Sequence, residues 1–141
     1  MATTNKNEVW NPIRNMPSAL VAASVAFCDG VLNVVLCPEA TEVGTKLPPN
    51  LKVCFHTPLA HAVYDDMVFS LSDIHGGFVG GVACIVKGSD WPVKHELLEK
   101  TGYKNVTHYR FFTSDSIVDV LAAGQVEVAW SEEHPLKSTN S

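Results

Sequence analysis

The stretch that decides the fold runs from residue 18 to residue 37 and reads SALVAASVAFCDGVLNVVLC. Two apolar runs meet at Asp29-Gly30, and an Asp-Gly pair between such runs is a strong signal for a β-hairpin with a two-residue turn. A turn of this length fixes the register of the two strands, and it places Cys28 opposite Val31. The sequence therefore predicts two long antiparallel strands near the start of the chain.

This register sorts the side chains of the hairpin onto two faces. One face is wholly apolar and is expected to pack on a core: Ala23, Val25, Phe27, Leu32, Val34 and Leu36. The other face carries small and polar residues, among them Ser24, Asn33 and Val35, and is predicted to lie under a helix or another subunit. An α-helix over residues 19–27 is the competing interpretation, because Pro17 could begin it and Gly30 could end it.

Further strands are predicted from alternating or continuous apolar patterns at residues 51–56, 67–72, 78–86, 108–112 and 126–130. Within the third of these, Gly80-Gly81 indicates a bulge or a close backbone approach. Two short helices are predicted at residues 91–101 and 115–123, the second with an apolar stripe and with Gly124 as its end.

These elements predict an α+β fold: a single β-rich domain with a mainly antiparallel sheet or sandwich of about six to eight strands and two short helices in its C-terminal half. Residues 1–17 lack apolar periodicity and are predicted to be an N-terminal arm with Trp10 as its anchor. Residues 18–130 would form the domain, and residues 131–141 a polar tail.

Charge and composition argue against several classes of partner. Ten Lys and Arg against fifteen Asp and Glu give a net charge of −5, which opposes binding to nucleic acid. Charged residues make up only 18% of the chain, against about 25% in typical soluble domains, and a surface of low charge suits burial against other copies of the chain. No apolar run has the length of a transmembrane helix, so no membrane partner is expected.

The four cysteines are Cys28, Cys37, Cys54 and Cys84, and none of them forms a CxxC pair. In the hairpin register Cys28 and Cys37 lie about 20 Å apart along the strands, which is too far for a disulfide. This pattern is typical of reduced cysteines, and together with the lack of a clear signal peptide it predicts a cytoplasmic location.

The densest group of polar residues follows the pattern Cys54-x-His56-x4-His61-x3-Asp65. Cys54 and His56 would share one face of a strand, and His61 and Asp65 could fold back after a turn at Thr57-Pro58. Thiolate, imidazole and carboxylate ligands suit zinc, and a cysteine near histidine and aspartate could also serve as a nucleophile. The favoured interpretation is nevertheless an outward strand face that runs into a polar loop.

A second polar pair, His108 and Arg110, shares one face of a predicted strand. This face could be a recognition strip open to solvent, or a packed face on which a salt bridge forms with Asp119. The second interpretation is favoured.

No short catalytic signature is present in the chain, so the sequence predicts a non-catalytic structural or interaction protein that self-associates. Such a protein could be an assembly, scaffold or virus-type accessory component. The predicted interface residues are Trp10, Ser24, Asn33 and Val35. No cofactor is expected for such a protein. The alternative is a small enzyme or metal-binding domain that uses Cys54, His56, His61 and Asp65, for which zinc is the candidate metal.

Overall fold

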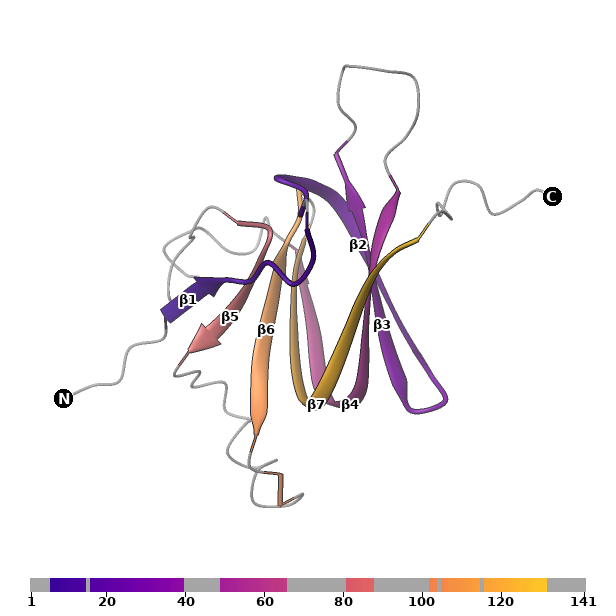
Figure 1. The fold of residues 1–141 in the computed structure, drawn as a ribbon, viewed down its shortest axis with the longest axis vertical. Coiled ribbons are helices and arrows are strands. Elements are labelled where there is room, and N and C mark those ends of the chain that lie inside the picture. Colours follow the sequence, from indigo (N-terminus) through magenta and orange to yellow (C-terminus); the bar gives the residue numbers. More distant parts are fainter. Residues whose placement is uncertain are drawn as a thin grey trace.

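The computed structural model describes residues 6–14, 16–39, 49–65, 81–87, 102–103, 105–114 and 116–131. These residues form one seven-stranded sheet in the order β1-β5-β6-β7-β4-β3-β2, and every neighbouring pair is antiparallel (Figure 1). The strands are β1 (Lys6–Val9), β2 (Leu20–Cys28), β3 (Val31–Pro38), β4 (Asn50–Asp65), β5 (Ala83–Lys87), β6 (Val106–Phe112) and β7 (Ser116–Ser131). The predicted β-rich, antiparallel fold is confirmed.

The hairpin of β2 and β3 forms as the sequence predicts, and the helical alternative over residues 19–27 is wrong. Phe27 pairs with Leu32, and Cys28 pairs with Val31, as the two-residue turn requires. Asp29 and Gly30 have φ values of 53° and 81°. Positive φ at both central residues is the hallmark of a type I′ turn, whose twist matches that of the strands it joins.

The predicted helix at residues 115–123 is wrong, because this segment is the first half of β7. Every residue from Ile117 to Ala123 is buried, so the strand is covered on both faces and its sequence lacks the alternation of a half-exposed strand. Apolar residues at Ile117, Val120 and Leu121 then match a helical spacing by coincidence. The helix predicted at residues 91–101 and the strand predicted at residues 67–72 lie outside the described residues.

Two irregularities bend β4 and β7 together near their middles, and both strands turn sharply at the lower edge of Figure 1. β7 has two residues between Ala123 and Val126, whereas β4 has only one residue between their partners, Thr57 and Phe55. Gly124 lies in this extra length with a φ of 75°, a conformation that glycine adopts without strain. Farther along, Leu59 is the extra residue in β4.

The bend folds the sheet over onto itself. Phe55 pairs with Val126 and Tyr109 pairs with Val120, so in a flat sheet their rows would lie about 20 Å apart along β7. Their ring centroids are instead 5.1 Å apart. The core fills the space between the two halves, and its buried residues are Leu20, Leu32, Val34, Leu36, Leu51, Val53, Phe55, Val82, Ala83, Tyr109, Phe111, Val118, Val120 and Ala122.

The N-terminal segment adds strand β1 to the sheet, although it lies within the stretch predicted as an arm. The Trp10 amide donates a hydrogen bond to the Ala83 carbonyl (2.9 Å), and the Trp10 ring packs 4.9 Å from the ring of Tyr109. A Cβ atom at Gly81 would lie 3.1 Å from Val9 Cγ1, so β1 passes very close to this glycine. The nearest contact at Gly81 is thus with the Val9 side chain, whereas the sequence indicates a bulge or a close backbone approach.

Within the described ranges no helix has the length and apolar character needed to span a bilayer.

Candidate functional site

The predicted cluster of Cys54, His56, His61 and Asp65 lies along one strand. At Thr57-Pro58, where the sequence predicts a turn, β4 remains one strand from Asn50 to Asp65 and bends sharply. This bend does not bring His61 onto Cys54, because the two residues lie on opposite faces of β4.

Cys54 and His56 lie on the face of β4 that points away from the core. Cys54 Sγ donates a hydrogen bond to Asn33 Oδ1 across the strand pair (2.9 Å). His56 Nε2 lies 3.2 Å from Glu127 Oε1, and both of these side chains are exposed. Exposed pairs of this kind contribute little to stability, typically below about 1 kcal/mol.

His61 lies on the opposite face of the sheet. Its pairing partner is Val120, a core residue, and residues directly opposite one another in an antiparallel pair share a face. His61 is nevertheless exposed. Cys54 and His61 therefore cannot ligate one ion. Among the described residues there is no group of three or more His, Cys, Asp or Glu side chains placed to hold a metal.

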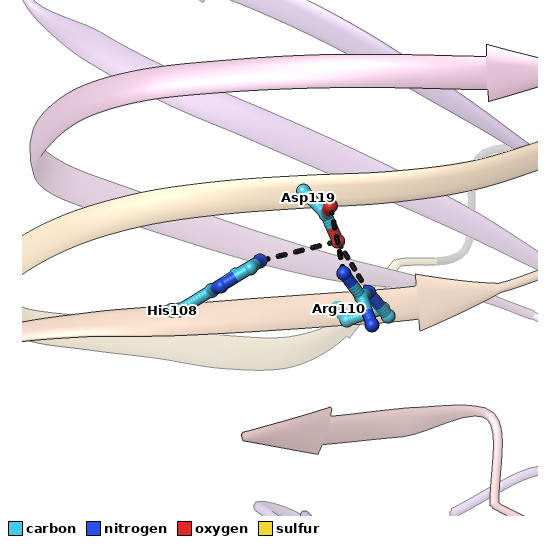
Figure 2. A network of polar contacts seen from close by, with 3 residues as sticks. All are labelled: His108, Arg110 and Asp119. Carbon is cyan, nitrogen blue, oxygen red and sulfur yellow. Dashed lines mark hydrogen bonds and ion pairs between the residues drawn. The ribbon is translucent and has the colours of Figure 1, made fainter. Parts of the chain in front are cut away.

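The structure instead brings three charged or titratable side chains together in a buried network (Figure 2). Arg110 and Asp119 are directly opposite residues of β6 and β7, and Arg110 donates from Nε to Oδ1 (2.7 Å) and from Nη2 to Oδ2 (3.1 Å). His108, also on β6, brings Nε2 to 3.3 Å from Asp119 Oδ1. All three side chains are buried, so the predicted packed face with a salt bridge to Asp119 is confirmed.

The electrostatics of the network favour an ionised aspartate. Burial by itself would raise the pKa of Asp119, but the hydrogen bonds from Arg110, its positive charge and the close approach of His108 outweigh this effect. The pKa of Asp119 is consequently held below its ordinary value. A bidentate pair of arginine and carboxylate is among the strongest polar contacts that a protein can form.

Two further groups adjoin this network, and no local pattern in the sequence predicts either of them. Cys84 on β5 is the pairing partner of Arg110, and burial raises the pKa of its thiol to about 12. The pKa of Tyr64 on β4 is raised by burial and then by the Asp119 carboxylate. A buried thiol that resists ionisation is a poor nucleophile.

The other predicted interface residues lie on or near the edge of the sheet at β2. Ser24 pairs with Val35 on the face that points away from the core, and Asn33 lies one row farther along this face. Strand β2 is the last strand of the sheet at this side, next to β3 (Figure 1). Phe27 is 64% exposed, the largest value among the exposed large apolar residues described.

Comparison of this chain with models of known families, with curated proteins and with solved structures finds no match.

Proposed function

We propose that this protein is a non-catalytic structural or interaction protein that self-associates through the edge strand β2. The observation that carries this proposal is an outermost strand with no charged residue and no proline. From Ala22 to Cys28 it is AASVAFC, and four of these seven residues are exposed. An exposed, uncharged edge is a template for pairing with another strand.

The other edges of the sheet differ from β2 in this respect. Strand β1, at the opposite side, carries Lys6 and Glu8. The second half of β4 extends beyond β3 and contains Pro58, and the second half of β7 extends beyond β6 and contains Glu127. Charges and prolines are the usual devices that keep an edge from pairing. Of the two outermost strands of the sheet, β1 and β2, only β2 lacks such residues.

The buried network supports the non-catalytic part of the proposal. Its arginine and aspartate satisfy one another, and the neighbouring thiol has a pKa of about 12. A catalytic group needs a pKa close to the working pH and access to a substrate. The metal-binding alternative would need Cys54 and His61 on one face, and they lie on opposite faces.

The test is the molar mass of the purified protein in solution, measured by size-exclusion chromatography with light scattering over a range of concentrations. We expect a mass above that of the monomer, and we expect Ser24→Lys/Ala26→Lys to lower it. Both positions are exposed, so the fold should tolerate the charges.

The matched control is His61→Lys/Val63→Lys, which adds lysines at two exposed positions of β4. This variant should associate like the unmodified protein. A strict monomer at every concentration, or an equal loss of association in both variants, would refute the proposal.

A further inference from the structure

The part of the β2 edge that is open to a partner is defined at both ends. At its start, the Leu20 carbonyl accepts hydrogen bonds from the Ser114 amide (2.9 Å) and from Ser114 Oγ (3.2 Å). The register of the hairpin then shifts at Val21, which is the extra residue of a bulge. At its end, the chain turns at Asp29-Gly30. The regular, open stretch is therefore residues 22–28, and Val25 is its centre.

We infer that the partner of this edge is a second copy of the chain, paired antiparallel to the first about a two-fold axis at Val25. The inference rests on the proposed function and specifies its geometry. A two-fold axis perpendicular to the sheet joins the two copies so that the core-facing side of one sheet continues into the core-facing side of the other. Residues at equal distances from Val25 then lie opposite one another, and the sheet continues from β3 through both β2 strands into the partner's β3.

The side chains that meet in this register are complementary in size. Phe27 lies opposite Ala23 of the second copy, and both belong to the face that also carries core residues of β3. The small alanine leaves room for a ring that is 64% exposed in the single chain. On the other face Ser24 lies opposite Ala26, and both are small and exposed.

Charge also favours a second copy as the occupant. A strand that pairs with itself places each charged residue close to its own like charge, and like charges directly opposite one another are destabilising. Residues 22–28 contain no charge, so this cost is absent. Val25 meets its own copy at the axis, where an apolar pair removes both side chains from water.

Cysteine cross-linking tests the register directly. In a Cys28→Ser background, Val25→Cys should form a disulfide-linked dimer on mild oxidation. Residues directly opposite in an antiparallel pair have Cα atoms about 4.5 to 5.5 Å apart, which suits a disulfide. Ala23→Cys should not link to itself, because the two copies of this position would lie about 14 Å apart along the strands.

A second measurement removes any dependence on how Val25→Cys folds. Ala23→Cys and Phe27→Cys should each remain unlinked alone, and they should form a mixed dimer when the two proteins are combined and oxidised. Phe27 is exposed, so its replacement should leave the fold intact.

The outcomes separate this inference from the proposed function. A disulfide-linked dimer of Val25→Cys supports the two-fold axis at Val25. If Val25→Cys does not fold, the mixed dimer of Ala23→Cys and Phe27→Cys supports the same axis. Strong linkage of Ser24→Cys or Ala23→Cys alone, with none at Val25, would refute this register and leave self-association intact. A dimer by light scattering that none of these variants cross-links would refute pairing through β2. A monomer throughout would refute both.

Discussion

Arg110 and Asp119 lie directly opposite one another on β6 and β7, and two hydrogen bonds of 2.7 and 3.1 Å join them inside the protein. Only 6% of Arg110 and 3% of Asp119 is exposed. A slip of one residue between these strands would turn one of the two charges to the other face and leave its partner buried alone. We infer that the pair helps to fix the register of the central strands.

Removing one member of this pair should strongly destabilise the protein. We expect Asp119→Asn to lower the free energy of unfolding by about 3 kcal/mol, because it leaves a buried guanidinium without its counter-charge. Arg110→Met/Asp119→Leu should cost less than Asp119→Asn, because it removes both charges. Urea unfolding at neutral pH measures both variants. A double variant less stable than the single one would contradict the expected coupling.

The same pair predicts how stability depends on pH. The pKa of Asp119 in the folded protein lies below its ordinary value of 3.8, so near this pH the unfolded chain binds more protons than the folded one. The contribution of Asp119 is thus fully present above about pH 5 and is lost as the pH falls through the folded pKa. The free energy of unfolding should fall less steeply on acidification in Asp119→Asn. Glu127→Gln, which removes an exposed carboxylate, should keep the steep fall.

The parts of the fold that the sequence predicts are those set by local chemistry. Asp29-Gly30 imposes its turn through its own backbone preferences, and the register of β2 and β3 follows from it. The Arg110–Asp119 pair can be predicted from the sequence because both residues interrupt apolar segments and they carry opposite charges. In the first case two adjacent residues decide the outcome, and in the second the two residues lie on strands that follow one another in the chain.

The parts that the sequence does not predict depend on residues far apart in the chain. Gly124 provides a positive φ, and this conformation ends a helix as readily as it forms a bulge. Only the pairing of β7 with β4 decides between them. To predict that Cys84 and Tyr64 lie near the buried pair, one must know the order of the strands in the sheet. The residues around positions 64 and 84 do not indicate this order.

The bend at Gly124 should be sensitive to substitution. Gly124→Ala should lower the free energy of unfolding by about 1 kcal/mol or more, because a φ of 75° is strained for alanine. A Cβ atom there would lie 3.5 Å from Thr57 Oγ1, an ordinary contact, so backbone strain is the main cause. Gly124→Asn should lose less, because asparagine tolerates this conformation better. Equal losses in thermal or urea unfolding would contradict the assignment to strain.

Trp10 should act on stability rather than on association. Its ring packs on Tyr109 and Phe111 of the same chain, so Trp10→Ala should lower the free energy of unfolding by about 2 kcal/mol or more. Trp130, which is 37% exposed, provides a control, and Trp130→Ala should cost less. Light scattering of the folded Trp10→Ala variant should show the mass of the unmodified protein. Loss of association without loss of stability would place Trp10 at an interface instead.

The cysteines should differ widely in their reaction with alkylating agents. Cys84 is fully buried and its thiol has a pKa of about 12, so at neutral pH it is present almost entirely as the unreactive thiol. Cys28 is exposed at the end of β2 and should react first. Mass spectrometry after timed treatment with iodoacetamide measures each site, and Cys84 should be modified only when urea unfolds the protein. Modification of Cys84 at the rate of Cys28 in the folded protein would mean that the face carrying the buried network opens readily to solvent.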